Sequence, residues 1–153
     1  VQVEPIVTAK EMYEKVTGAA KEQDVIIKAA AVADYRPATV ATEKVKKKEG
    51  AAKIELERTD DILAALGAQK GNTILCGFSM ETEHMLENSR AKLKKKNLDL
   101  IVANNLKVEG AGFGTDTNVL TIISKEKETQ LSLMSKEDAA DHVLDAIMEL
   151  KTK

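Results

Sequence analysis

The sequence is poor in the residues on which several classes of protein depend. Its 153 residues include one cysteine, Cys76, no tryptophan, two prolines and only 3% aromatic residues. A single cysteine excludes an internal disulfide framework and fits a reducing compartment, so we expect a cytoplasmic protein. The scarcity of aromatic side chains leaves little to stack successive nucleobases, which proteins that bind single-stranded nucleic acid need.

The chain also lacks long apolar runs and a strong excess of either charge. No apolar stretch approaches the roughly 20 residues of a membrane span, and residues 1–7 contain no cationic leader. The net charge of −2 gives no global field that would attract nucleic acid or an anionic membrane. With 43% hydrophobic and 31% charged residues, the sequence instead predicts a globular protein, with residues 1–153 forming one domain and neither nucleic acid nor a membrane as a partner.

Short β-branched runs alternate along the chain with amphipathic segments. Strands are predicted at 1–7, 24–30, 52–57, 73–79 and 98–103, and helices at about 9–21, 60–69, 82–96 and 136–150. A polar loop is predicted at 33–42 and a β-hairpin at 119–124 and 129–133. Strands that alternate with helices indicate βαβ units. We therefore expect a three-layer, Rossmann-like α/β fold with a mostly parallel sheet and a C-terminal antiparallel hairpin.

Capping residues mark the predicted starts of three helices. Thr8 with Glu11 forms a capping-box pattern, and Ser135 with Asp138 has the same spacing. Thr59 or Asp60 is expected to begin the helix that runs to about residue 69. The backbone amides at such a start either hold an anionic ligand group or are simply capped by the side chain, and capping is at least as good an explanation.

Ligands of open α/β sheets bind beyond the carboxyl ends of the parallel strands. The loops after Ala31, Ser79 and Ala103 are therefore the places where a site is expected. In the first of them, Asp34 is suited to a nucleobase, a ribose hydroxyl or a metal ion, and the small side chains before it allow a ligand to approach the backbone. An ordinary loop with an aspartate cap explains the same residues equally well.

Two lysine clusters and one phenylalanine are further candidates. The clusters are Lys44, Lys46, Lys47 and Lys48, and Lys92, Lys94, Lys95 and Lys96. Ammonium groups suit polyphosphate, and a mobile first cluster is able to close over a triphosphate. Taken alone, each cluster is better explained as a solvated surface, and Phe78 is better explained as a core residue than as a base-stacking one.

Other site types have little support. The glycine-rich segment 110–114 has neither the spacing nor the position of a dinucleotide-binding fingerprint. His84 and His142 lie apart from any cluster with the spacing of metal ligands, so a zinc site is not expected.

The candidate residues belong to a set of motifs with a definite order. The motifs are A-A-V-A-D-Y-R-P at 30–37, E-K-V-K-K at 43–47, D-I-L at 61–63, G-F at 77–78, E-T at 81–82, R-A-K at 90–92, K-N-L-D at 96–99, A-N at 103–104, and G-F at 112–113 with Asp116 and Asn118. In this order they resemble the phosphopantothenoylcysteine synthetase domain of bacterial coenzyme A biosynthesis proteins. The first two motifs are specific together, and the resemblance covers essentially the whole chain.

This resemblance implies a CTP- and Mg²⁺-dependent phosphopantothenate–cysteine ligase. CTP activates the carboxylate of 4′-phosphopantothenate as an acyl-cytidylate, and the amine of cysteine then displaces CMP. Lys44 matches a CTP-contacting position, and we expect it to be the catalytic residue that stabilises charge during acyl-cytidylate formation. The implied nucleotide-binding residues are Ala30, Ala31, Asp34, Lys44, Asp60, Asp61, Ile62, Leu63, Phe78, Lys92 and Lys96, and Asn104 is a candidate for substrate binding.

The sequence departs from the family pattern at its front and at Asp60. Many relatives have proline at the position of Asp60. Family members also begin with a strand, a glycine-rich turn, a helix and an Asn-His-Ser-Ser-Gly-Lys-Met-Gly-like segment, which this sequence lacks. We therefore expect this chain alone to bind CTP weakly and not to turn over. The resemblance further implies a homodimer and a parent protein fused to a flavin-dependent decarboxylase domain.

Several alternatives stay open on the residues alone. They do not decide between CTP and ATP. An NAD(P)-binding oxidoreductase shares the fold class, although no G-x-G-x-x-G is present, and stronger binding of NADH than of CTP would favour it. A non-catalytic binding module would use the lysine patches and an apolar sheet edge. Unchanged CTP affinity after Lys44→Gln would favour that module.

Overall fold

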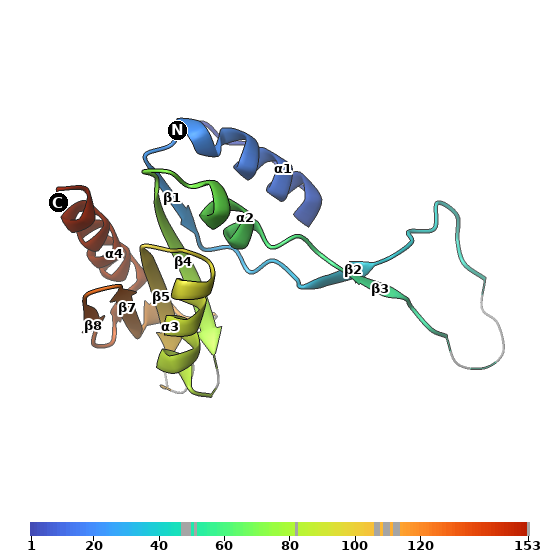
Figure 1. The fold of residues 1–153 in the computed structure, drawn as a ribbon. Coiled ribbons are helices and arrows are strands. Elements are labelled where there is room, and N and C mark those ends of the chain that lie inside the picture. The colour runs from blue at the N-terminus through green and yellow to red at the C-terminus, as the bar shows by residue number, and fades with distance from the viewer. Residues whose placement is uncertain are drawn as a thin grey trace.

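A five-stranded mixed sheet forms the centre of the molecule (Figure 1). The computed structural model describes residues 1–46, 50, 52–81, 83–105, 108, 111 and 114–152. The strands are β1 (Val25–Lys28), β4 (Ile74–Glu81), β5 (Leu100–Asn105), β7 (Leu120–Ser124) and β8 (Glu128–Gln130), in the order β1-β4-β5-β7-β8. The first three are parallel to one another, and β7 and β8 are antiparallel. The predicted mostly parallel sheet with a C-terminal antiparallel hairpin is confirmed.

Helices cover both faces of this sheet and make the three predicted layers (Figure 1). On one face lie α1 (Ala9–Ala19), the short 3-10 helix η1 (Ala20–Glu22), α2 (Ile62–Gln69) and α3 (Met85–Lys95), and on the other lies α4 (Lys136–Lys151). Successive side chains of a strand point to opposite faces, so β5 contributes Ile101 to the first core and Leu100 and Val102 to the second. No described helix is long and apolar enough to cross a membrane.

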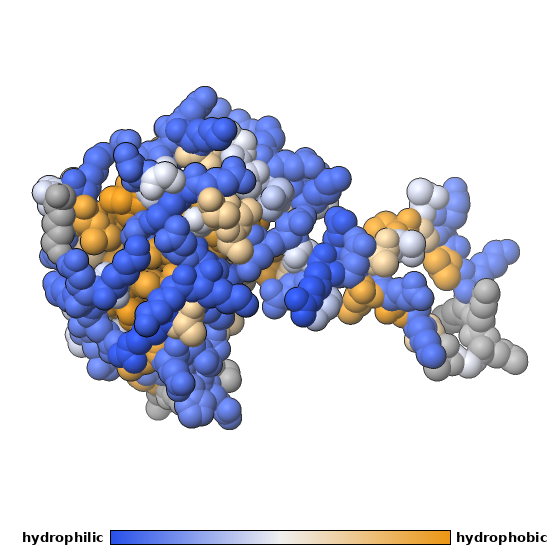
Figure 2. All heavy atoms as spheres, in the orientation of Figure 1, coloured by the Kyte–Doolittle hydropathy of each residue, from blue (hydrophilic) through white to orange (hydrophobic). Residues whose placement is uncertain are grey.

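Two short strands form an arm that projects from the body of the molecule (Figure 1). We define the arm as β2 (Tyr35–Pro37), β3 (Leu56–Arg58) and the described residues between them. The two strands pair antiparallel, and Arg36 forms an ion pair with Glu57 at 2.7 Å. Apolar side chains remain exposed along the arm, among them Val40, Ile54 and Leu56, as Figure 2 shows. The predicted loop at 33–42 is therefore wrong over β2, and the strand predicted at 52–57 is shorter than expected.

Residues 1–7 form no strand, although their sequence predicts one. A strand is defined by backbone hydrogen bonds to a neighbour. The Val7 amide instead donates to the Glu11 carboxylate at 2.7 Å, and Val1, Val3 and Val7 are exposed. The β-branched pattern alone cannot supply the partner, which explains this error.

The helix starts show which capping predictions hold. Thr8 forms a full capping box with Glu11, and Ser135 accepts a hydrogen bond from the Asp138 amide, as predicted. The start of α2 was predicted at Thr59 or Asp60, but its N-cap is Asp61, whose carboxylate accepts from the Ala64 amide. Two further pairs of residues, β6 (Thr117–Asn118) and β9 (Met134–Ser135), form a small antiparallel ladder that was not predicted.

Candidate functional site

A cavity of about 490 Å³ opens at the carboxyl ends of β1 and β4. The N-terminus of α2 and the last turn of α3 form its other walls. Every site residue predicted from the sequence except Lys44 lines it. The lining residues are Lys28, Ala29, Ala30, Ala31, Val32, Asp34, Thr59, Asp60, Asp61, Ile62, Leu63, Phe78, Ser79, Met80, Lys92, Lys96 and Asn104.

Thr59 connects the two loops that border the cavity on the side of the arm. Its hydroxyl donates to the Ala33 carbonyl at 2.5 Å, and its amide donates to the Asp34 carbonyl at 3.0 Å. These bonds fix the loop after β1 against the loop before α2. The carboxylate of Asp34 remains exposed at the rim of the cavity, where a hydroxyl or amino group of a ligand can reach it.

Asp61 and Lys96 form an ion pair across the cavity wall. Lys96 Nζ lies 2.9 Å from Asp61 Oδ2 and 3.1 Å from Oδ1, which also accepts from the Ala64 amide. Partial burial raises the pKa of Asp61, but the hydrogen bonds from Lys96 and Ala64 and the charges of Lys96 and Lys28 outweigh it and hold that pKa below its ordinary value. Asp61 is therefore ionised at neutral pH and keeps the ammonium of Lys96 within the cavity.

Lys92, one helical turn before Lys96, is paired with the last residue of β4. Its ammonium lies 2.5 Å from Glu81 Oε1. Residues four apart on a helix share one face, as the sequence predicted for Lys92 and Lys96, and both side chains line the cavity. The other two lysines of the cluster, Lys94 and Lys95, do not line it.

Two glycines allow the helices to approach so closely that these charges meet. A Cβ at Gly67 of α2 would lie 1.9 Å from the Lys96 carbonyl oxygen, and Asn97 Nδ2 donates to the Gly67 carbonyl at 2.9 Å. A Cβ at Gly77 of β4 would lie 2.9 Å from a methyl group of Leu63, in the first turn of α2. The absence of both side chains brings α2 against the end of α3 and against the sheet, and it thereby sets the separation of Asp61 and Lys96.

Phe78 and Asn104 complete the wall that the sheet provides. Phe78 is half-buried and packs against the core cluster beneath α4, yet it also lines the cavity, so the structural and functional interpretations of this residue are compatible. Asn104, at the end of β5, accepts a hydrogen bond from Asn118 Nδ2 at 3.0 Å. That bond fixes the orientation of the Asn104 amide at the cavity wall.

Lys44, the predicted catalytic residue, lies outside the cavity. It is exposed on the arm between β2 and β3, as is Lys46. Lys47, Lys48 and the pair Gly112 and Phe113 fall outside the described residues. The catalytic role of Lys44 stays a prediction.

The sequence interpretation missed Lys28, the last residue of β1. It was assigned to a continuous apolar run, but its side chain lines the cavity and its ammonium donates to the Ala30 carbonyl at 3.0 Å. A lysine at the carboxyl end of an otherwise apolar strand was the available signal. A charge in such a run needs an explanation, because lysine is seldom buried without a partner.

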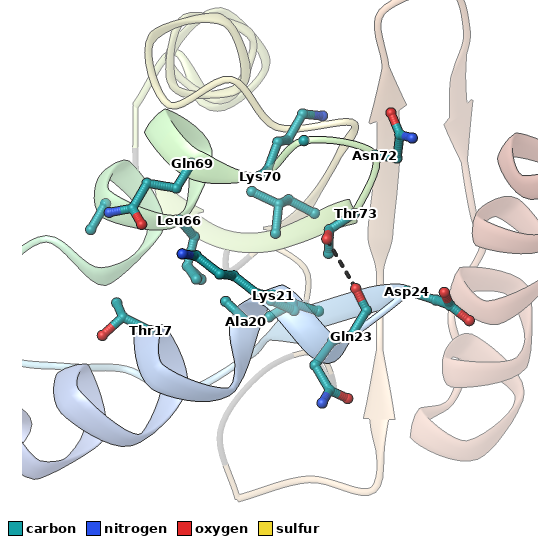
Figure 3. A pocket seen from close by; sticks show the side chains of 14 residues that line it. Thr17, Ala20, Lys21, Gln23, Asp24, Leu66, Gln69, Lys70, Asn72 and Thr73 are labelled. Atoms are coloured by element: carbon teal, nitrogen blue, oxygen red, sulfur yellow. Dashed lines mark hydrogen bonds between the residues drawn. The ribbon is translucent and has the colours of Figure 1, made fainter.

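A second hollow, of about 480 Å³, lies at the opposite end of the sheet (Figure 3). It is bordered by α1, η1 and the end of α2, and Thr73 donates to the Gln23 carbonyl at 2.9 Å along its edge. None of the residues predicted from the sequence lines it. Its position at the amino ends of the parallel strands is not where ligands of open sheets bind.

Nucleophilic and metal chemistry find little support among the described residues. Cys76 is completely buried, and burial raises the pKa of its thiol to about 12, so the reactive thiolate is not formed at neutral pH. Within the described ranges, no group of three or more histidine, cysteine or acidic residues is arranged to hold a metal ion. The charged side chains that line the cavity are instead three lysines, Lys28, Lys92 and Lys96, and three aspartates, Asp34, Asp60 and Asp61.

Comparison with known proteins shows the family of the chain. Residues 1–150 match the family described as DNA/pantothenate metabolism flavoprotein C-terminal domain. The chain is 46% identical over 147 residues to the coenzyme A biosynthesis bifunctional protein CoaBC of Bacillus subtilis (strain 168), covering 95% of this chain and 36% of the relative. It is 43% identical over 145 residues to a cysteine/cysteine sulfinic acid decarboxylase of an unknown prokaryotic organism, covering 94% of this chain and 40% of the relative.

A solved structure gives the same result for the fold. The crystal structure of the C-terminal domain of a CoaBC protein superposes with a TM-score of 0.76 at 42% identity, covering 100% of this chain and 68% of that one. The chain spans 36% and 40% of the lengths of these two curated relatives. On the family match and these identities, the chain belongs to the DNA/pantothenate metabolism flavoprotein C-terminal domain family.

Proposed function

We propose that the chain supplies the nucleotide-binding part of a phosphopantothenate–cysteine ligase of coenzyme A biosynthesis. The observation that carries this proposal is the cavity itself. It gathers Asp34, Phe78, Lys92 and Lys96 from separate segments at the carboxyl ends of parallel strands. These are the positions that the family resemblance assigns to CTP, and the similarity to proteins named for coenzyme A biosynthesis supports the same pathway.

The cavity offers a group for each part of a nucleotide. Phe78 provides an apolar wall for a base, and the exposed Asp34 carboxylate is an acceptor for ribose hydroxyls or an exocyclic amine. Lys92 and Lys96 provide positive charge for phosphate groups, and each is held in place by a carboxylate until a ligand arrives. Ala30 and Ala31 leave the backbone after β1 accessible to the ligand.

The proposed reaction has two steps. The carboxylate of 4′-phosphopantothenate attacks the α-phosphorus of CTP, and pyrophosphate leaves with formation of an acyl-cytidylate. The amine of cysteine then attacks the acyl carbon, and CMP leaves as the amide bond forms. Fixed positive charge stabilises both the pentavalent phosphorus centre and the departing phosphates, and Lys44 is the residue proposed to add to it.

Mg²⁺ is proposed to arrive with the triphosphate. This ion keeps several waters and is commonly held by one or two carboxylates together with substrate phosphates. Asp34 and Asp60 are exposed carboxylates on the cavity wall and are suited to that role, whereas Asp61 and Glu81 are occupied by lysines. The ion would neutralise phosphate charge as pyrophosphate departs.

The arm is proposed to join two copies of the chain in a homodimer. A two-stranded ribbon is marginally stable in water by itself. The exposed fractions of Ile54 and Leu56 are 75% and 59%, and both lie on the arm, with free strand edges on either side. Leu56→Glu should shift sedimentation from dimer to monomer without changing the circular dichroism of the body. The proposal would be contradicted if the wild-type chain and the variant both sediment as monomers.

The word bifunctional in the name of the Bacillus subtilis relative supports a fusion to a second enzyme. We propose that this second part is the flavin-dependent decarboxylase domain expected from the resemblance, and that the whole protein works in the cytoplasm. Proteolysis of the natural protein into two folded units, one of them yellow with bound flavin, would support the fusion.

Calorimetric titration of CTP, ATP and UTP with Mg²⁺ tests the nucleotide proposal. We expect CTP to bind most tightly and Phe78→Ala to weaken CTP by about tenfold, the order of one lost base-stacking contact. Thr17→Ala, in the opposite hollow, is the control and should not affect binding. Equal affinity for the three nucleotides, or tighter binding of NADH, would contradict a CTP-dependent ligase.

A further inference from the structure

Lys28 occupies a position that is set by the strand and by its neighbour in the sheet. Ile26, two residues earlier, points to the same face of β1 and packs into the core beneath α1 and α2. Lys28 therefore leaves the sheet on the α2 side, just beyond that core. Its partner in the register with β4 is Gly77, whose missing side chain brings the first turn of α2 close. The ammonium is thus directed into the cavity.

Lys28 differs from the other two lysines of the cavity because it forms no ion pair. Lys92 is paired with Glu81 and Lys96 with Asp61, at 2.5 Å and 2.9 Å. Within the described parts of the chain, Lys28 has no carboxylate within ion-pair distance and donates to the neutral carbonyl of Ala30. Burial lowers the pKa of Lys28, the nearby charge of Lys96 lowers it further, and Asp61 only partly opposes them. The exposed carboxylates of Asp34 and Asp60 also line this cavity, but neither forms an ion pair with Lys28.

A structural lysine in this protein looks different. Lys70, at the other end of the sheet, contacts both carboxylate oxygens of Asp99 at 2.5 Å. Its side chain is only 12% exposed. Lys28 has neither that partner nor that geometry, so a purely structural role leaves its charge unexplained.

We propose that Lys28 is a further phosphate-binding residue of this site, which together with Lys96 holds one phosphate group of the ligand. The inference rests on the proposed function and adds to it a residue that the family motifs do not assign. A phosphate bound between the two ammonium groups gives Lys28 an anionic partner and offsets the repulsion between Lys28 and Lys96. Asp61 then serves as the counter-ion that keeps Lys96 in position while the site is empty of ligand.

The experiment compares Lys28→Met with the wild-type chain. Methionine keeps the length of the side chain and removes the charge. Mg²⁺–CTP, inorganic triphosphate, 4′-phosphopantothenate and cytidine are titrated separately by calorimetry. We expect Lys28→Met to weaken CTP and triphosphate by roughly tenfold, the order of one lost charge-assisted hydrogen bond. Cytidine, which has no phosphate, should bind equally to both proteins.

Two further variants make the result specific. Lys21→Met removes the same charge from the opposite hollow and should leave every affinity unchanged. Lys28→Arg keeps the charge and should restore most of the lost affinity. Circular dichroism of each variant should overlay the wild-type spectrum, and a Lys28→Met variant that fails to fold is replaced by Lys28→Gln for the same titrations.

The outcomes separate this inference from the proposed function. Loss of affinity for 4′-phosphopantothenate alone assigns the bound phosphate to that substrate and supports Lys28. If triphosphate binding depends on Lys28 while no nucleotide is preferred, the phosphate site stands and the CTP-dependent ligase does not. Equal affinities of wild type and Lys28→Met for all phosphate ligands, including no binding to either, overturn the role of Lys28. Normal CTP binding in that case leaves the proposed function intact.

Discussion

The two ends of the parallel sheet use lysines in opposite ways. At the amino ends of β4 and β5, Lys70 is fastened to Asp99, which also accepts a hydrogen bond from the Leu75 amide at 2.9 Å. At the carboxyl ends of β1 and β4, Lys28, Lys92 and Lys96 line an open cavity, where Lys92 pairs with Glu81 and Lys96 pairs with Asp61. Asp99 closes one end through its own hydrogen bonds, whereas Lys28 at the other end donates to the neutral carbonyl of Ala30.

We propose that this difference separates a structural lysine from lysines that bind a ligand. A carboxylate that is held by a lysine and a backbone amide fixes β5 to β4 and to the end of α2. The Asp61–Lys96 pair is more exposed, with the Asp61 side chain at 50%, and a ligand can exchange with it at low cost. Perturbing each end should therefore change different measured quantities.

The largest effect is expected from Asp99→Asn. This change removes the charge opposite Lys70 and leaves a mostly buried ammonium unpaired. Breaking one partner of a buried ion pair is strongly destabilising, so the free energy of unfolding should fall by about 3 kcal/mol. Urea denaturation followed by circular dichroism measures this fall. Lys10→Gln is the control at an exposed surface position. If Asp99→Asn changes the free energy of unfolding by no more than this control does, the Lys70–Asp99 pair does not stabilise the fold as described.

Gly67→Ala should have the next largest effect and should change both stability and binding. The added Cβ meets the Lys96 carbonyl at 1.9 Å, so the end of α3 must shift away from α2. Overpacking of this kind costs about 1–3 kcal/mol of unfolding free energy, and displacement of Lys96 should also weaken CTP.

Gly18→Ala is the matched control for this change, since Gly18 is also helical but has no heavy atom within 4 Å of its would-be Cβ. It should raise the free energy of unfolding slightly through helix propensity. A Gly67→Ala protein with unchanged stability and unchanged CTP affinity would show that the close approach of the helices does not position Lys96.

Lys96→Gln should weaken binding more than folding. It removes one ammonium from the cavity, and CTP affinity should fall by about tenfold while the free energy of unfolding changes by less than about 1 kcal/mol. Lys95→Gln removes a charge from the neighbouring position, outside the cavity, and should leave CTP affinity unchanged. Both variants are titrated with CTP at two salt concentrations. Equal losses of affinity in Lys96→Gln and Lys95→Gln would indicate that CTP responds only to the overall positive charge of this region.

The smallest effect is the pH dependence that Asp61 contributes to stability. Its pKa in the folded chain lies below the ordinary value of 3.8. A lowered carboxyl pKa gives stability that is fully present above the unfolded value and is lost as pH falls through the folded value. The difference in unfolding free energy between wild type and Asp61→Asn should therefore be constant from pH 5 to 7 and shrink below about pH 4. If the difference in unfolding free energy grows as the pH falls, the Asp61–Lys96 ion pair does not stabilise the folded chain in the way described.

Much of the site could be predicted from the sequence because parallel strands end at the same edge of a sheet. Asp34, Phe78 and Asn104 follow or end three such strands, and Lys92 and Lys96 lie on the helix between two of them. Correct assignment of β1, β4, β5 and α3 was enough to place these residues together. Their order along the chain is what carries the resemblance to the family.

The rest depends on contacts that no local pattern encodes. Lys28 belongs to a mostly apolar run, so the sequence did not indicate that it lines a cavity. Its place in the cavity wall depends on the close approach of α2 to Gly77. The sequence predicts Thr59 or Asp60 as the cap of α2, whereas the structure uses Asp61, and Thr59 instead bonds to Ala33 and Asp34 in the loop after β1. The arm is a pairing of two distant and weakly patterned segments, so neither β2 nor the position of Lys44 followed from periodicity.

The central claim is that the carboxyl-end cavity, and not the hollow at the amino ends, binds the nucleotide. Amide chemical shifts of the ¹⁵N-labelled chain during titration with Mg²⁺–CTP test it directly. The account predicts that the shifts concentrate at residues 28–34, 60–63, 78–81 and 92–96, with residues 20–24 and 69–73 unchanged. Shifts confined to 20–24 and 69–73, or no shifts at saturating CTP, would contradict it.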